Sequence, residues 1–170
     1  MIERSITIFP EFENGRLIDE LRSKYDPLYQ LIPPHITLVF PFTSDLTAEQ
    51  LHAHIESVLL HEKLFSIKLQ GVTGEGSEYL FLNVKKGNDE IIRLHDLLYT
   101  GRLREFLFRE LTYVPHLTVG RFNDTGDFKA ALNETAQFTE EFTTTVNHIV
   151  VEKIEESGLS QPEFYVDLRN

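Results

Sequence analysis

The chain has 170 residues, of which 41% are hydrophobic and 11% aromatic; these values are typical of one globular domain and exclude an intrinsically disordered chain. The absence of cysteine excludes disulfides, zinc–thiolate sites and thiol nucleophiles. The formal net charge of −11 argues against a long nucleic-acid duplex or strand as a ligand, because such binding depends on neutralising many phosphates. A small phosphorylated substrate or an RNA terminus needs only a local positive charge and fits this composition.

The sequence contains no run of about 18 apolar residues, so we expect no membrane span. Residues 1–9 lack the basic region and apolar core of a signal peptide, and their alternation predicts a first strand instead. The expected location is therefore the cytoplasm.

The first half of the chain alternates between strand and helix patterns. We expect strands at residues 4–9 and 34–40, each closed by a proline, and a helix at 14–24 that Asn14 could cap. Thr47 and Gln50 form a capping box ahead of a second helix. The apolar stripe of that helix is formed by Leu51, Ile55, Val58 and Leu59.

The second half repeats this alternation. Strands are expected at 64–72, 78–85 and 113–122, helices at 88–99 (capped by Asn88) and 126–136, and a final hairpin from 143–154 and 163–169. The mixture predicts the α+β class rather than a parallel sheet. We expect a single bilobal domain over residues 1–170, with two lobes of mostly antiparallel sheet and flanking helices. A rough two-fold should relate the lobes, with a groove between them.

One short motif occurs in both halves: Pro-His-aliphatic-Thr-aliphatic, at residues 34–38 and 115–119. Its histidines lie 116 − 35 = 81 residues apart, close to half of 170, so a duplication is the first interpretation to consider. A histidine and a threonine two positions apart in a strand point to the same face. Two such strands facing one groove would present two imidazoles and two hydroxyls to a single ligand.

This layout predicts acid–base chemistry at a phosphodiester. An imidazole titrates near pH 6.5, so one ring of a pair can be neutral and accept a proton while the other is charged and donates one. His35 and His116 are the expected catalytic pair, and the motifs are too alike to say which is the base. Thr37 and Thr118 are expected to donate hydrogen bonds to the non-bridging phosphate oxygens.

Arg121 follows Thr118 by three residues. A twist or bulge at Gly120 would bring its guanidinium to the phosphate, where a two-pronged contact is favourable. The scheme needs neither a metal nor a cofactor.

The paired motifs, half a chain apart in a cysteine-free protein of this length, resemble the two-histidine (2H) phosphoesterase superfamily. The segment Tyr25-Asp26-Pro27 and the blocks 32–37 and 114–120 resemble its bacterial 2′-5′ RNA ligase-like branch. The resemblance implies a bilobal α+β fold and metal-independent action on 2′,3′-cyclic phosphates or 2′-5′ linkages. It also implies His35 and His116 as the catalytic pair and Thr37 and Thr118 as phosphate-oxygen donors.

The leading hypothesis is thus a cyclic phosphodiesterase acting on a small nucleotide or an RNA end. Ligation of 2′-5′ bonds would use the same groups in reverse. A module that binds a phosphorylated metabolite or RNA end without catalysis is the alternative from another class, and turnover of a 2′,3′-cyclic nucleotide would separate the two. A two-histidine metal site lacks a third ligand at a recognisable spacing, so no metal is expected.

Overall fold

Strands and helices alternate along most of the chain in the structure, a computed structural model that describes residues 1–170. The elements are β1 (Ile2–Ile8), α1 (Arg16–Tyr25), β2 (Ile36–Ser44), α2 (Ala48–Val58), β3 (Phe65–Glu75), β4 (Tyr79–Lys86), α3 (Asn88–Leu98), the 3₁₀ helix η1 (Gly101–Phe106), β5 (His116–Arg121), α4 (Thr125–Thr135), β6 (Glu141–Val146), β7 (His148–Ile154) and β8 (Ser160–Asp167). None of the helices has the length and apolar character needed to cross a membrane.

The strands form two four-stranded sheets, ordered β2-β1-β7-β8 and β5-β4-β3-β6, and every pairing within them is antiparallel. The two motif strands, β2 and β5, hold equivalent places, each at one edge of its sheet. These two edges contact each other. The predicted α+β fold with two related lobes is confirmed, and the contact between the edges brings the two motifs to the boundary of the lobes.

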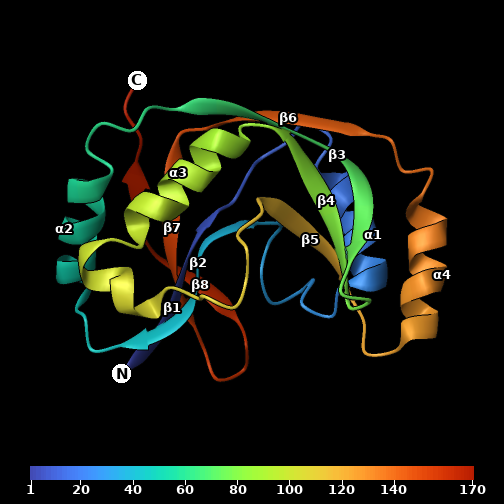
Figure 1. Ribbon diagram of the computed structural model, residues 1–170, viewed down its shortest axis with the longest axis horizontal. Helices are drawn as coiled ribbons and strands as arrows, with labels where there is room; N and C mark the ends of the chain where they lie inside the picture. Colours follow the sequence, from blue (N-terminus) through green and yellow to red (C-terminus); the bar gives the residue numbers. More distant parts are fainter.

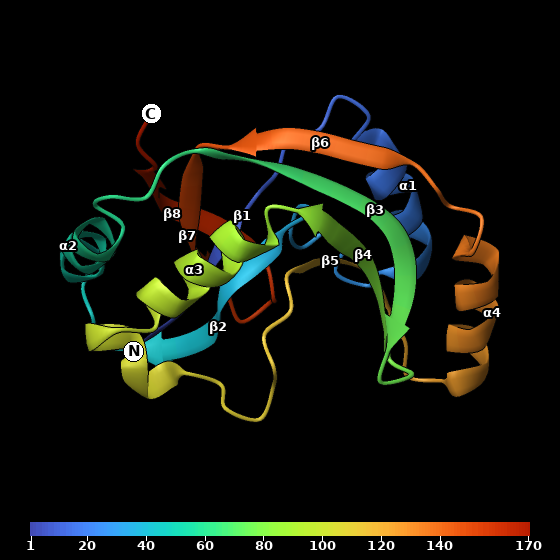
Figure 2. The ribbon, with the colours of Figure 1, turned by 45° about the horizontal axis from the view of Figure 1, so that its top comes forward.

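Two helices pack against a motif strand from the other half of the chain. Helix α1 packs against β5, and α3 packs against β2, so each half supplies a helix to the other half's motif strand. Helices α2 and α3 lie on one side of Figure 1, and α1 and α4 lie on the other. In Figure 2, β3 and β6 arch between the two sides. A single cluster of 30 buried apolar residues runs through both sheets, so neither motif strand is supported by its own half alone.

Two strand predictions were wrong. Pro41 was expected to end the first motif strand, but β2 continues to Ser44; Pro41 is exposed on an edge strand, where the missing N–H leaves no ladder bond unmade. The predicted strand 143–154 is divided at Asn147, with β6 in one sheet and β7 in the other. Pattern alone could not show this division, because both parts alternate in the same way.

The helix-cap predictions had mixed outcomes. The capping box of Thr47 and Gln50 is confirmed, with both reciprocal bonds formed. Asn14 and Asn88 are not caps: Gly15 and Gly87 hold those positions. The Asn14 amide instead donates to the backbone carbonyl of Glu141 at 3.0 Å, so its side chain joins two distant segments.

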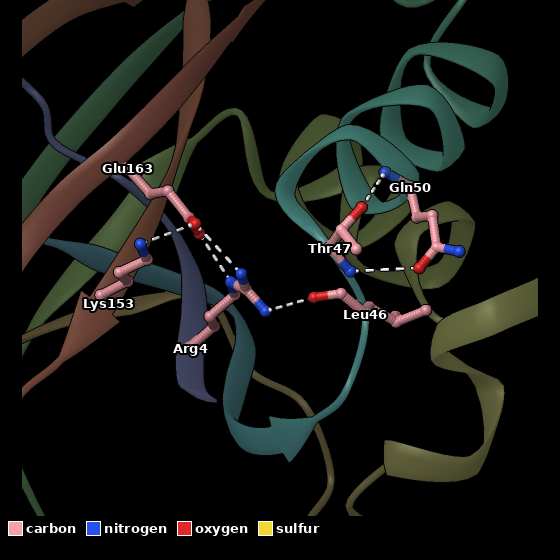
Figure 3. Close-up of polar contacts among 6 residues, drawn as sticks. All are labelled: Arg4, Leu46, Thr47, Gln50, Lys153 and Glu163. Atoms are coloured by element: carbon pink, nitrogen blue, oxygen red, sulfur yellow. Dashed lines mark hydrogen bonds and ion pairs between the residues drawn. The ribbon is translucent and has the colours of Figure 1, made fainter. Parts of the chain in front are cut away.

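A buried ion pair ties the first strand to the last (Figure 3). Arg4 of β1 is 1% exposed and donates to both carboxylate oxygens of Glu163 in β8, at 2.6 and 3.0 Å. Its remaining nitrogen reaches the carbonyl of Leu46, immediately before the α2 capping box, at 2.8 Å. The guanidinium thus joins β1, β8 and the segment before α2, at the end of β2 away from His35.

Candidate active site

The two histidines are held in the same way. His35 directly precedes β2 and His116 begins β5, and each ring uses Nδ1 to contact the carbonyl two residues earlier: Pro33 at 2.8 Å and Val114 at 2.6 Å. A carbonyl can only accept, so Nδ1 carries the hydrogen in both rings. Nε2 is left free, with a lone pair when the ring is neutral. The two motifs therefore share the tautomer of their histidines as well as their sequence.

A register shift follows each motif threonine. In the β1–β2 pair, Thr7 faces Thr37 and Ile6 faces Val39, so Leu38 is an extra residue. In the β4–β5 pair, Phe81 faces Thr118 and Leu80 faces Gly120, so Val119 is the extra residue. Such bulges change which residues share a face of the strand.

The second bulge decides the direction of Arg121. Arg121 faces Tyr79, which shares a sheet face with Phe81 and hence with Thr118. Without the extra residue, Arg121 would point to the apolar core. Phe40 holds the corresponding position after the first motif, five residues beyond its histidine. The same kind of bulge thus precedes a cation, Arg121, on one strand and an aromatic ring, Phe40, on the other.

A buried carboxylate holds Arg121. The side chain of Asp26 is fully buried, and its Oδ1 accepts from the Arg121 guanidinium and from the Leu28 backbone N–H. Its Oδ2 accepts from Nε of Arg22, itself 1% exposed, at 2.9 Å. Burial raises the pKa of Asp26, but Arg121, the Leu28 N–H and Arg22 together hold that pKa below its usual value. Asp26 is therefore a carboxylate between two guanidinium groups.

Both histidines have lowered pKa values. Burial is the main cause for His35, and the positive charges of Arg121 and Arg22 add to it, so its pKa falls to about 4. Burial also lowers the pKa of His116, again assisted by Arg121. Arg121 thus contributes to the lowered pKa of both rings, which lie at the contacting edge strands of the two sheets. At neutral pH both rings are neutral in the free protein.

Aromatic side chains fix the ring planes. Phe81 stacks on His116 with ring centres 3.6 Å apart and an interplanar angle of 17°. Phe9 meets His35 edge-on, with ring centres 6.2 Å apart. With Nδ1 anchored and one face covered, the freedom of the His116 ring is reduced before any ligand binds.

Two tyrosines, one buried and one half-buried, attach the first motif strand to the second half of the chain. Tyr113 donates its hydroxyl to the carbonyl of Thr37 at 2.7 Å, and the Phe40 N–H donates to the Tyr99 hydroxyl at 3.0 Å. His95 stacks on Tyr113 with ring centres 3.8 Å apart, which explains this buried histidine as part of the support. The backbone groups around the first bulge thus have partners outside the sheet.

The structure brings His35, His116, Thr37, Thr118 and Arg121 to the contacting edges of the two sheets. Asp26 and Arg22 also belong to this region, although neither was expected there from the sequence. Arg22 follows buried Ile18 by four residues, so it lies on the buried stripe of α1, a signal available in the sequence. Nowhere in the chain do three His, Cys, Asp or Glu side chains gather as metal ligands would.

Comparisons with known proteins agree with this geometry. A family model described as the 2′-5′ RNA ligase superfamily matches residues 9–158. A Geobacillus kaustophilus protein named "putative phosphoesterase" is 33% identical over 122 residues, covering 68% of this chain and 67% of the relative. A Bacillus cereus protein of the same name is 32% identical over 119 residues, with the same coverage.

Solved structures show the same fold. E. coli LigT complexed with 3′-AMP matches with a TM-score of 0.67 and 15% identity, covering 99% of both chains. The protein TT0787 of Thermus thermophilus matches with a TM-score of 0.64 and 17% identity, also over 99% of both chains. The fold is thus shared across the full length, and the family model covers both motif strands. The chain belongs to the 2′-5′ RNA ligase superfamily and is a phosphoesterase-like protein.

Proposed function

We propose that the protein is a metal-independent phosphoesterase that hydrolyses a 2′,3′-cyclic phosphate or a 2′-5′ phosphodiester of a small nucleotide or RNA end. One observation carries the proposal: two imidazoles, anchored in the same tautomer with free Nε2 atoms, lie at the contacting edge strands of the two sheets. A binding site would need donors only, whereas the neutral Nε2 atoms of His35 and His116 are bases. This arrangement suits proton transfer on both sides of a phosphorus atom.

His35 is proposed as the general base. Its pKa of about 4 keeps it neutral over the physiological range, so Nε2 can take the proton of an attacking water. The water oxygen forms a bond to phosphorus as the bond from phosphorus to the 2′- or 3′-oxygen breaks. His116 is proposed as the general acid, because the negative charge of the bound phosphate raises the pKa of a neighbouring imidazole. Its proton passes to the leaving oxygen, and one water is added overall.

Thr37, Thr118 and Arg121 are proposed to hold the non-bridging oxygens. Each threonine lies two residues beyond its histidine on the same strand face, and Arg121 joins that face through the bulge at Val119. Donors already in place stabilise the charge that develops in the transition state without having to reorganise. Asp26 keeps Arg121 in position but leaves part of its guanidinium free, since the Arg121 side chain is still 24% exposed.

The names of the similar proteins support this substrate class. The curated relatives are named as phosphoesterases, and E. coli LigT has been crystallised with 3′-AMP, ATP and NADP⁺. We therefore propose a nucleotide as the group attached to the phosphate. Ligation of a 2′-5′ bond is the reverse reaction on the same groups and is the second candidate. A binding module without turnover is the third.

The test is a panel of 2′,3′-cyclic mononucleotides, 2′-5′ dinucleotides and non-nucleotide cyclic phosphates, assayed with and without EDTA. We expect hydrolysis of at least one nucleotide substrate, unchanged by EDTA, with the phosphate retained on one hydroxyl only. The doubly substituted protein His35→Ala/His116→Ala controls for contaminating activity. Binding without turnover of any substrate would leave the binding module as the better description.

A further inference from the structure

Three arginines without acidic partners line one cavity. Arg4, Arg16, Arg22, Arg93 and Arg121 are all ion-paired, so five of the nine arginines have an acidic partner within the fold. Three of the four others, Arg102, Arg104 and Arg109, are exposed and line a cavity of about 580 Å³ together with Gly101, Glu105 and Leu107. In a chain of net charge −11, a cavity with three cations and one carboxylate stands out as a local positive region.

This arginine cavity lies next to the first motif strand. The η1 helix that carries Arg102 and Arg104 is anchored by buried Leu103, and Phe106 packs on Phe42 of β2 with ring centres 5.0 Å apart. Phe108, which is 47% exposed, contacts Phe40, with ring centres 6.0 Å apart. Phe40 is the counterpart of Arg121 and follows Thr37 by three residues. The path from the arginine cavity to the motifs is therefore lined by accessible aromatic surface.

We propose that Arg102, Arg104 and Arg109 form a second phosphate-binding site, which holds the backbone of an oligoribonucleotide whose terminal phosphate lies between His35 and His116. This inference rests on the proposed function and specifies its substrate as a short RNA rather than a free mononucleotide. Guanidinium groups bind phosphates through paired N–H donors. Phe40 and Phe108 offer a surface on which an intervening base can stack.

Charge distinguishes this cavity from the one that touches the residues before His35. A cavity of about 530 Å³ touches Pro33 and Pro34, but its lining includes the carboxylates of Glu11 and Asp19. Its only arginine, Arg16, is paired with Glu20. Phosphate would be repelled there and attracted to the arginine cavity, so of these two cavities the arginine cavity is the one suited to a second phosphate.

The experiment compares a 2′,3′-cyclic mononucleotide with a six-residue RNA ending in a 2′,3′-cyclic phosphate. The test variant is Arg102→Gln/Arg104→Gln/Arg109→Gln. The control, Lys63→Gln/Lys129→Gln/Arg169→Gln, removes the same charge at exposed side chains with no ion pair in the structure. Lys129 lies on α4, at the far side of the molecule from η1 (Figures 1 and 2).

We expect the test variant to keep its kcat/KM for the mononucleotide and to lose on the order of tenfold in kcat/KM for the RNA, chiefly through KM. The dependence of RNA binding on log salt concentration should become shallower by about 2, because three contacts to a single strand each contribute about 0.7. Equal losses in the control variant, or an unchanged KM for the RNA, would overturn the proposal.

Binding of a six-residue RNA ending in a 3′-phosphate, measured by fluorescence anisotropy, separates this proposal from the proposed function. If no substrate is hydrolysed but the test variant alone binds this RNA more weakly, the arginine site stands and the catalytic proposal fails. If hydrolysis occurs, and the unsubstituted protein, the test variant and the control variant bind the RNA equally, the catalytic proposal stands and the arginine site is wrong.

Discussion

Strands β2 and β5 share three features and differ in a fourth. Each has at its start, or directly before it, an imidazole anchored by a carbonyl two residues earlier. Each continues with a threonine two residues after the histidine and shifts register at the next residue. Five residues beyond the histidine, one strand has Phe40 and the other has Arg121. The shared features fit proton transfer, which needs a group on each side of phosphorus. The difference gives the site one charged and one aromatic side, which suits the proposed nucleotide substrate.

The largest effect should come from removing either imidazole. We expect His35→Ala and His116→Ala each to lower kcat by about 10²–10⁴-fold, the usual contribution of a positioned acid or base. The pH–rate profile separates their roles: loss of His35 should abolish the acidic limb and loss of His116 the basic limb. Full activity of either variant would show that the two strands are not catalytic equivalents.

Asp26→Asn should release Arg121, the residue by which β5 differs from β2. It leaves buried Arg22 without its charge partner, so we expect a loss of about 3–5 kcal/mol in unfolding free energy, measured by urea titration. Because Arg121 is no longer held, kcat/KM should also fall about tenfold.

Glu163→Gln is the matched control for Asp26→Asn, because it breaks the buried pair with Arg4, which faces Phe42 at the other end of β2 from His35. It should destabilise the protein but leave the kinetic constants unchanged. In an Arg121→Gln background, Asp26→Asn should add little to the kinetic loss; a full additional loss would mean that Asp26 does not act through Arg121.

The low pKa of His35 predicts a stability that depends on pH. The ring titrates near pH 6.5 when unfolded and at about 4 when folded, so the unfolded chain binds the extra proton between these values. Acidification from pH 6.5 to 4 should therefore lower the unfolding free energy by about 1–2 kcal/mol, less than the full shift implies because the ring is partly exposed. His35→Gln should flatten this part of the curve. An equally steep curve for the variant would assign the loss to other groups.

The smallest effects should come from the two tyrosines behind β2. Tyr113→Phe and Tyr99→Phe each remove one hydroxyl that meets the β2 backbone, and each should cost about 1 kcal/mol of unfolding free energy. Only Tyr113→Phe should also reduce kcat, since Thr37 is its partner and belongs to the proposed phosphate contacts. Equal kinetic effects would show that the tyrosines support the strand as a whole.

Local patterns in the sequence were sufficient to predict most helices and strands of the fold. Alternation and helical spacing located the strands and helices to within a few residues, and Thr47 and Gln50 identified a cap, because these signals depend on neighbours in the chain. The repeated motif singled out the histidines and threonines, and their proposed roles remain predictions. The continuation of β2 beyond Pro41 depended on its place at a sheet edge, and the division of the tail depended on which sheet each part joins.

The sequence by itself determined that two similar strands would each present a histidine and a threonine, because strand alternation follows from backbone geometry. Only the tertiary structure decided that Asp26 would hold Arg121 across 95 residues, and that Arg22 would be buried beside it. It also decided that three unpaired arginines would gather beside Phe40 and Phe108. Contacts between distant segments depend on how the sheets and helices pack together, and no local pattern encodes that packing.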